Sequence, residues 1–385
     1  MNPLSEIITT EINFDKFSNK LEQENLDKYL QTCLKEKGIL DFNSLSNSLL
    51  IFNFSKTDSH YDLGALLWLI VVLNKLRKQG NNIKLIFPEP GTQNGDRIWS
   101  FLTRWRFFNA LEKCVDDPVN LLAPNQIQYI NRTGIYKKSG MWEEVDKNGV
   151  IHLRHTDRLL EIATLRPDFI GGWNDTIDNY LQLYYSDVLK QIFGKYCGWP
   201  EKITDDFVIK IIKEGLDNSF IHSRNDFTNI SLSIDKENVI FSISDNGIGI
   251  PESLRLRYRL TGVNDTLANE KDDDKLLMHF TKQEMIKETF LMQEKFNNDS
   301  NLINEATKLG VGAKDRRGVG LFEMKMFILK SNGQLRIRSG KAMVDFYLTE
   351  IKKDPKEKFY DDLLESPGTM IRAIIPIIKP QQTKS

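Results

Sequence analysis

Three short stretches carry the side chains that could bind or activate a charged ligand. In chain order they read KEGLDNSFIHS (213–223), SDNGIGIP (244–251) and RRGVGLFEMK (316–325). The first supplies a carboxylate and a carboxamide, the second a carboxylate followed by glycines, and the third a glycine-rich loop. In this order they predict a pocket for a nucleotide and its metal ion.

The first stretch belongs to a segment whose apolar spacing predicts an amphipathic helix. Glu214, Asn218 and His222 follow one another at intervals of one turn, so they project to one side. An amide oxygen can coordinate Mg²⁺ while a carboxylate orients or deprotonates an attacking oxygen. An ordinary polar helix face is the alternative for this stretch alone. The apolar stripe consists of Phe207, Ile211, Ile212, Leu216 and Ile221.

The second stretch follows two predicted strands, ISLSI and VIFSI, which are joined by a polar turn at 235–238. Asp245 ends the second strand, where its carboxylate can accept a hydrogen bond from the exocyclic amine of a base. Gly247 and Gly249 would let the backbone approach the ring closely. A common Asp-Asn-Gly turn is the alternative, but such a turn requires neither the second glycine nor the apolar residues around it.

The third stretch is a glycine-rich segment that leads into a predicted helix, Leu321 to Lys330. Exposed amides at a helix N-terminus form an anion site suited to phosphates. A hinge is the alternative, because hinges are also rich in glycine. Beyond the helix, Asn332 and Gly333 predict a turn into two further strands, QLRIRSG and AMVDFYLT. The glycines of the segment are Gly310, Gly312, Gly318 and Gly320.

Together, the three stretches resemble the GHKL ATPase superfamily, whose Bergerat fold is shared by gyrase-type, chaperone, mismatch-repair and histidine-kinase ATP-binding domains. The resemblance covers roughly 203–376. It implies an α/β sandwich in which helices cover one face of a mixed sheet, with ATP and Mg²⁺ as ligands. It also implies an ATP lid at about 250–317, which would close over the nucleotide or carry a surface for a protein partner.

The resemblance implies a role for each matching residue. Glu214 would be the general base or would orient the attacking water, and Asn218 would be the Mg²⁺ ligand. Asp245 would read the adenine, with Gly247 and Gly249 beside the base. Thr369, in SPGTMIRAIIP, matches a late Gly-Thr before a strand, where a hydroxyl supports the adenine site. His222 would lie near phosphate, and the phosphate loop would include Gly318, Val319, Gly320 and Leu321.

The N-terminal third of the chain predicts a separate, small α/β domain. A helical segment within residues 1–45 would end at Gly38. Strands and helices then alternate, which implies parallel strands with right-handed crossovers. The predicted strands are 49–55 and 83–88, and the predicted helices are 63–77 and 96–114.

This pattern, over roughly 46–115, resembles the STAS domain of anti-sigma-factor antagonists, and we expect a domain at 46–117. The family has a phosphorylatable Ser or Thr in the turn before the first helix. This chain has DSHYDLG (58–64), which places Asp62, or the region of His60 and Tyr61, at the acceptor position and displaces Ser59. We therefore expect an interaction or dimerisation domain without phosphorylation.

Residues 118–200 are predicted to form a linker. A hairpin turn at Asn148-Gly149 is indicated, followed by a helix over 173–196. His152 and His155 are interpreted as an exposed pair rather than metal ligands, because no cysteine or third histidine is near. The ATP-binding domain would occupy 201–378, and 379–385 would form a tail.

Size and composition limit the classes of function. The chain has 385 residues, 40% hydrophobic and 27% charged, which fits a globular protein of two domains. A net charge of −1 gives no basic field for specific nucleic-acid binding. Three separated cysteines and the lack of a signal peptide indicate a reducing cytoplasm. The apolar run at 63–73 is too short to span a membrane.

Three functions remain open on this sequence. The leading one is a cytoplasmic, Mg²⁺-dependent ATP-binding regulator, an ATPase whose nucleotide state controls a regulatory protein partner. The alternatives are a Ser/Thr protein kinase of the anti-sigma partner-switch type and an interaction module with a vestigial ATP site. The helix at 175–196 lacks histidine, so a sensor histidine kinase architecture is unsupported. A homodimer is a further expectation from the resemblance.

Overall fold

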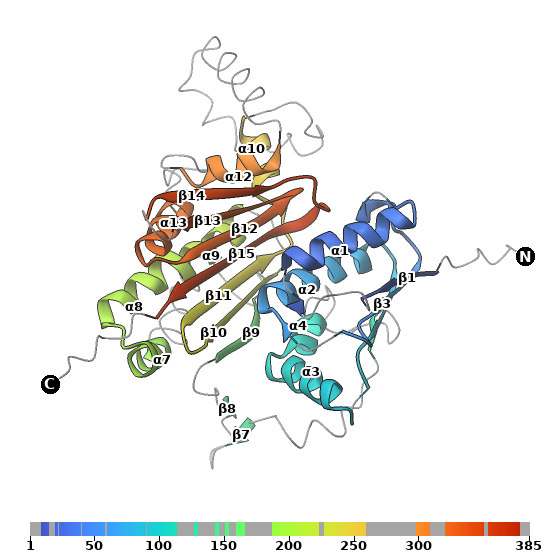
Figure 1. Ribbon diagram of the computed structural model, residues 1–385, viewed down its shortest axis with the longest axis horizontal. Helices are drawn as coiled ribbons and strands as arrows, with labels where there is room; N and C mark the ends of the chain where they lie inside the picture. Colours follow the sequence, from blue (N-terminus) through green and yellow to red (C-terminus); the bar gives the residue numbers. More distant parts are fainter. Residues whose placement is uncertain are drawn as a thin grey trace, which may run out of the picture. The chain divides into compact units, whose positions relative to one another are not determined.

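The computed structural model divides the chain into two compact units (Figure 1). The first comprises Met1–Leu165 with Asn229–Ser233, and the second comprises Arg166–Thr228 with Ile234–Ser385. The structure describes residues 9–14, 20–21, 23–39, 41–57, 60–89, 91–113, 127–129, 143–145, 151–153, 159–165, 187–222, 227–258, 298–308, 320–349 and 353–377.

The first unit contains a parallel sheet in the order β1-β3-β5-β6. The parallel strands confirm the α/β prediction for this part of the chain. β1 and β6 were not predicted, because neither segment shows a long apolar run in the sequence. The strands are β1 (Thr9–Asn13), β3 (Leu49–Asn53), β5 (Asn82–Ile86) and β6 (Ile127–Tyr129).

Helix α2 (Leu63–Lys78) accounts for the long apolar run of the sequence, because nearly all of its residues are buried. Asp62 caps it by accepting the N–H of Ala65 at 3.3 Å, and three basic residues lie in its last turn. Helix α1 (Gln23–Glu36) precedes it and ends near Gly38 as expected, with φ +71° at that glycine. Among the described helices, none is long and apolar enough to cross a membrane.

The helix predicted over 96–114 is wrong as a single element. The structure has two helices, α3 (Gln93–Arg104) and α4 (Phe107–Lys113). Arg106 takes a left-handed conformation, φ +53°, which ends the first helix. The Trp105 carbonyl accepts the N–H of Ile162 at 3.2 Å instead of a helical partner. A contact with a distant strand, β9 (Leu159–Leu165), therefore accompanies the break.

Smaller elements complete the first unit. β7 (Glu143–Val145) and β8 (Ile151–Leu153) pair antiparallel, with Val145 opposite Ile151, which confirms the predicted hairpin. Its Asn148-Gly149 turn lies outside the described residues, as does His155. β2 (Lys20–Leu21) pairs with β4 (His60–Tyr61), and a short turn of 3-10 helix spans Phe42–Ser44.

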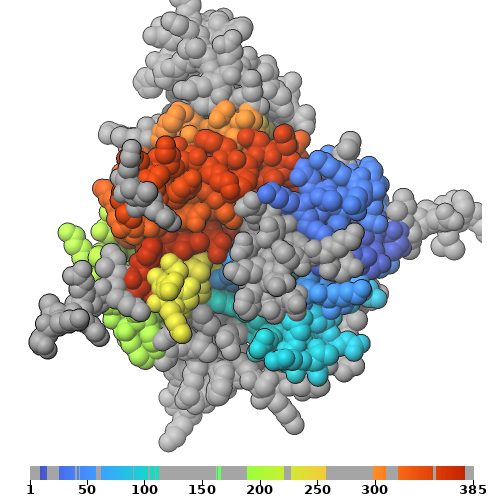
Figure 2. All heavy atoms as spheres, viewed as in Figure 1, coloured from blue at the N-terminus to red at the C-terminus, as the bar shows by residue number. Residues whose placement is uncertain are grey.

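The second unit contains an antiparallel sheet in which five strands follow the order β14-β13-β12-β15-β11. The strands from the C-terminal part of the chain form the red surface of Figure 2. Asp235 accepts the N–H groups of Glu237 and Asn238 in the turn before β11, as predicted. The strands are β11 (Asn238–Asp245), β12 (Gln334–Gly340), β13 (Ala342–Leu348), β14 (Pro355–Tyr360) and β15 (Ser366–Pro376). β10 (Thr228–Ile234) precedes them in the chain, and its residues Asn229–Ser233 belong to the first unit.

Helices pack on this sheet through aromatic and small residues. Phe207 meets Phe241 of β11 and Phe327 of α13, with ring centroids 6.0 and 6.4 Å apart. A Cβ on Gly215 would lie 3.3 Å from Ile243, so the glycine lets the helix approach the strand. The expected α/β sandwich is confirmed. The helices are α7 (Asp187–Cys197), α8 (Glu201–Phe207), α9 (Glu214–Asp217), α10 (Ile250–Tyr258), α12 (Asp299–Ala306) and α13 (Gly320–Lys330).

The site helix is continuous with α8, but it is not a regular α-helix as the sequence predicted. Wider π turns occupy Val208–Lys213 and Asn218–His222, on either side of α9. The N–H of Glu214 reaches the carbonyl of Ile209, five residues earlier. Within α9 the spacing is α-helical, because the N–H of Asn218 bonds to the carbonyl of Glu214. Glu214 and Asn218 therefore stay one turn apart, as expected.

Candidate nucleotide site

The start of α13 lies directly against Glu214 and Asn218. A Cβ built on Gly320 would fall 2.2 Å from Glu214 Oε2 and 3.6 Å from Asn218 Nδ2. Only glycine leaves room for both side chains at this position. The carboxylate, the carboxamide and the first residue of the helix thus form one corner of the site. Two of the three sequence stretches meet here, as predicted.

The Asn218 amide has an unsatisfied polar atom. Its Nδ2 is buried and has no hydrogen-bond partner among the described residues. A buried amide that lacks a partner is costly unless another group completes the site. No group of three or more His, Cys, Asp or Glu among the described residues could hold a metal ion alone. Mg²⁺ bound here would take Asn218 Oδ1 as its protein ligand and complete its shell with water and phosphate oxygens. The unsatisfied Nδ2 is a donor, so it fits a phosphate oxygen rather than the metal.

Asp245 forms the second corner, at the end of β11, where its side chain is buried. Its Oδ1 accepts the N–H of Gly247 at 2.8 Å and that of Thr369 at 3.3 Å. Burial raises the pKa of Asp245 to about 7, and these hydrogen bonds, with one from Ser219, oppose the rise. A further donor, such as the amine of a base, would favour the ionised form. Ser219 was not identified from the sequence.

Gly368 makes the approach of β15 to Asp245 possible. Its φ is +110°, and a Cβ there would lie 2.1 Å from the Asp245 carbonyl oxygen and 2.9 Å from Asp245 Oδ1. The register between β12 and β15 shifts beside it, between Ser339 and Gly340. The sequence placed this Gly-Thr pair before a strand, and that placement is wrong. Both residues lie inside β15, at an irregularity that aims Thr369 at Asp245.

Ser339, on β12, connects the two sides of this corner, and no sequence pattern pointed to it. Its hydroxyl lies 3.0 Å from Thr369 Oγ1, 2.9 Å from the Ile250 nitrogen and 3.3 Å from the Gly368 carbonyl oxygen. Gly249, with φ +81°, would place a Cβ 2.8 Å from the same hydroxyl. The predicted role of this glycine in close backbone approach therefore involves a serine from a distant strand. Cross-strand contacts of this kind cannot be found from local sequence.

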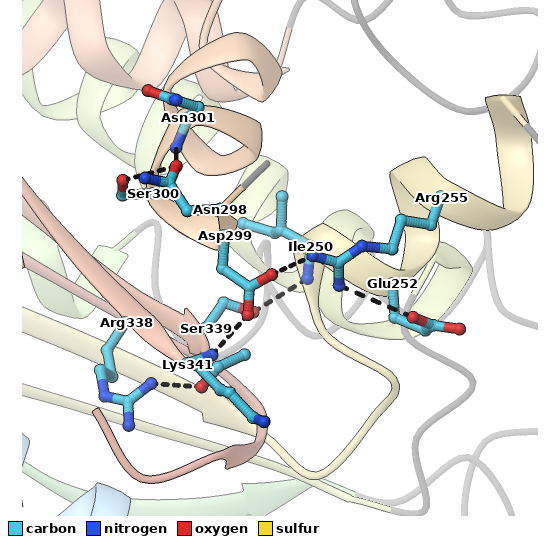
Figure 3. Close-up of polar contacts among 11 residues, drawn as sticks. Ile250, Glu252, Arg255, Asn298, Asp299, Ser300, Asn301, Arg338, Ser339 and Lys341 are labelled. Carbon is cyan, nitrogen blue, oxygen red and sulfur yellow. Dashed lines mark hydrogen bonds and ion pairs between the residues drawn. The ribbon is translucent and has the colours of Figure 1, made fainter. Parts of the chain in front are cut away.

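A polar cluster fixes α10 and α12 to the turn between β12 and β13 (Figure 3). Asp299 pairs with Arg255, and its Oδ2 accepts the N–H of Lys341 at 2.6 Å. The fully buried Arg338 donates to the carbonyls of Gly340 and Ala342 at 2.5 and 3.2 Å. Residues 251–258 and 298–308 within the predicted lid range are therefore anchored to the sheet.

Leu321 packs against an apolar cluster, and its role in the phosphate loop stays a prediction. This cluster joins α10 to α12 and also includes Ile250. Leu321 thereby fixes the beginning of α13 relative to these two helices. The buried members of the cluster are Leu254, Leu302 and Ala306.

The side-chain positions of three predicted site residues lie outside what the structure describes. Gly318 and Val319 lie outside the described residues, as do the predicted lid segments at 259–297 and 309–317. His222 ends the helical segment, but its side chain is outside the described set. The roles assigned to these three residues therefore stay predictions.

Comparisons with known proteins match one part of the chain to a family. Residues 204–358 match the family described as "Histidine kinase-, DNA gyrase B-, and HSP90-like ATPase". The match runs from α8 into β14, so Thr369 lies beyond its end. No curated protein matches the chain. Among solved structures, the mycobacterial sensor histidine kinase MprB aligns with 13% identity and a TM-score of 0.20, covering 56% of this chain and 96% of that one. That TM-score is too low to show a shared fold.

Proposed function

We propose, from the ATPase-type domain at residues 204–358, that this protein binds ATP with Mg²⁺ and hydrolyses it. The observation that carries the proposal is the corner where Gly320 leaves room for Glu214 and Asn218. This corner combines a carboxylate, an amide with an unsatisfied atom and the start of a helix. These are the groups that a hydrolytic phosphate site needs.

Glu214 would orient and deprotonate the attacking water, because it is the carboxylate beside Asn218. Asn218 would hold Mg²⁺, which when bound would neutralise charge on the phosphate oxygens. Helix α13 begins at Gly320 beside these two side chains, and a helix N-terminus favours negative charge nearby. Asp245 would accept a hydrogen bond from the exocyclic amine of adenine, with Thr369 beside it.

The biological role that we propose is regulatory. The nucleotide state would set the predicted lid, whose two ends are α10 and α12, joined by Arg255 and Asp299, and would thereby control contacts with a protein partner. A cytoplasmic location is part of this proposal, and it is supported by Cys197, which is a buried thiol outside any disulfide. The STAS-like reading of the first unit and a homodimer remain part of this proposal. The cap that Asp62 places on α2 favours an interaction role without phosphorylation there.

Calorimetry with Mg·ATP tests the binding claim. We expect the wild type to bind and Asp245→Asn to bind at least tenfold more weakly, because the variant loses a charged acceptor. Ser242→Ala is the matched control, since Ser242 is buried in the same strand and its hydroxyl has no partner among the described residues. Undetectable binding by the wild type would refute the proposal.

The reaction is tested with ATP labelled on its γ-phosphate. Hydrolysis predicts free labelled phosphate, and Glu214→Gln should slow its release by about 10²- to 10⁴-fold while ATP binding persists. Label retained on the protein, or moved to a Ser or Thr of its first unit, would indicate a protein kinase instead. Loss of Mg²⁺ to a chelator should abolish either reaction.

A further inference from the structure

The hydroxyl of Ser339 lies at the centre of three hydrogen-bonding groups and is itself fully buried. A serine hydroxyl has one hydrogen to donate and two lone pairs to accept with. The Ile250 N–H can only donate to it, and the Gly368 carbonyl can only accept from it. Thr369 Oγ1, at 3.0 Å, can do either.

Only one arrangement of hydrogens satisfies all three neighbours. Ser339 donates its hydrogen to the Gly368 carbonyl and uses one lone pair for the Ile250 N–H. Its second lone pair then accepts the hydrogen of Thr369. The Thr369 hydroxyl is thereby committed as a donor toward Ser339, so that it presents lone pairs alone to any ligand. Buried hydroxyls settle into such satisfied arrangements because an unpaired one is costly.

Thr369 is also joined to Asp245, because its N–H donates to Asp245 Oδ1 at 3.3 Å. The ionised Asp245 carboxylate accepts hydrogen bonds and cannot donate them. The two neighbouring side chains therefore offer acceptors of the same kind. A purine with an amino group at position 6 matches them, whereas a purine with a carbonyl there would place acceptor against acceptor.

We propose that Ser339 is a positioning residue that fixes the hydroxyl of Thr369 as an acceptor and so makes the site select 6-amino over 6-oxo purine nucleotides. The inference rests on the proposed ATP site and adds the residue that sets its selectivity. Figure 3 shows Ser339 with Ile250 and beside the turn that Arg338 and Asp299 hold in place. This surrounding structure keeps the serine rigid, so it cannot reorient easily.

The test compares Mg·ATP with Mg·ITP, which differ in the group at position 6 and in the hydrogen that the 6-oxo base carries on N1. Calorimetry gives the ratio of the two dissociation constants for the wild type and for Ser339→Ala. In the variant, the Thr369 hydroxyl is free to donate to the carbonyl of ITP. We expect the preference for ATP to fall about five- to tenfold, the scale of one hydrogen bond. General loosening of the site would weaken both nucleotides alike and leave the ratio unchanged.

A double-mutant cycle separates this role from a structural one. Thr369→Val removes the hydroxyl but keeps the side chain's shape, and it should itself reduce the preference. Because Ser339 acts through Thr369, adding Ser339→Ala to Thr369→Val should change the ratio no further. Ser242→Ala should leave the ratio as in the wild type. Ser339→Cys, which fills similar space but hydrogen-bonds weakly, should behave like Ser339→Ala and serves if the alanine variant does not fold.

Two results would overturn the inference while leaving the proposed function intact. One is an unchanged ATP preference in Ser339→Ala and Ser339→Cys, when the wild type binds ATP. The other is an effect of Ser339→Ala that persists undiminished in the Thr369→Val background. A wild type that binds neither nucleotide would instead overturn the proposed function, and the inference with it.

Discussion

Gly320 is the residue that most directly determines the geometry of the corner formed with Glu214 and Asn218. An added methyl group would lie 2.2 Å from Glu214 Oε2, so one of the two must move. The carboxylate is the end of a flexible side chain and moves more easily than a helix. We therefore expect Gly320→Ala to fold, with an unfolding free energy within about 1 kcal/mol of wild type. ATP turnover should fall at least tenfold, because Glu214 is displaced.

Gly194→Ala is the matched control for Gly320→Ala. Gly194 also lies in a helix of the second unit, α7, but a Cβ there would meet nothing within 4 Å. This variant should gain about 0.5–1 kcal/mol of stability and keep full turnover. Phosphate release and denaturant unfolding measure the two effects. Normal turnover in Gly320→Ala would show that Glu214 does not act from this corner.

Asp245 should make ATP affinity depend on pH. Burial raises its pKa to about 7, so about a tenth is ionised at pH 6 and about nine tenths at pH 8. The amine of adenine favours the ionised form, so affinity should rise about five- to tenfold over this range. Calorimetry at several pH values measures it. Asp245→Asn should bind more weakly and its affinity should lack this rise with pH. Any pH dependence that the variant retains measures the titration of ATP itself and is subtracted.

The sequence located the charged residues of the site but not the groups that orient them. Glu214, Asn218 and Asp245 could be found because helical spacing and a strand end place them locally. Ser339 meets Ile250 across 89 residues of chain and Thr369 across 30. Its position depends on the register of β12 against β15, which no local pattern determines. The role of Gly368 could not be predicted either, because its positive φ is required only by the approach to Asp245 in the folded sheet.

At the scale of elements, the α10–α12 pair provides a direct test of stability. Asp299 holds both the Arg255 guanidinium and the Lys341 N–H, and its side chain is only 10% exposed. Asp299→Ala leaves the Lys341 N–H without this acceptor and Arg255 with only its 3.9 Å contact to Glu252, and it should cost the second unit about 2–3 kcal/mol. Arg255→Ala should cost about 1 kcal/mol, because Asp299 keeps Lys341. Denaturant unfolding measures both.

Asn298→Ala provides the comparison within the same helix. Asn298 caps α12 by accepting the N–H of Asn301 at 3.1 Å, and its loss should cost about 1 kcal/mol. If Asp299→Ala costs no more than this, the cluster in Figure 3 stabilises the protein no more than one helix cap does. The cost of Asp299→Ala should also shrink in an Arg255→Ala background, because the pair is then already broken.

Elements with strong local patterns were predicted well, and elements shaped by tertiary contacts were not. The buried α2, the hairpin of β7 and β8, and the strands β11 to β13 follow their sequence periodicity. The π turns around α9 do not, because the apolar residues have spacings of four and five that suit either helix type. β14 was also missed, since nearly all of its residues are exposed and it shows no apolar alternation.

At the scale of the whole molecule, the two units should respond differently to ATP. Every described residue of the proposed site belongs to the second unit. A ligand that binds only the native state stabilises it by about 2.7 kcal/mol at 100 times its dissociation constant. In scanning calorimetry we expect two transitions, with Mg·ATP raising only one of them. Asp245→Asn should remove that rise and leave the other transition in place.

Strand β10 is divided between the two units, so it can couple their unfolding. Asn229–Ser233, in the middle of β10, belongs to the first unit, whereas the residues before and after it belong to the second. If β10 makes unfolding cooperative across both units, a single transition will move as a whole when ATP binds. That result would contradict the expectation of two transitions, because nucleotide binding would then stabilise the first unit as well. Two independent transitions would instead confine the effect of ATP to its own unit, and the partner surface would have to lie there.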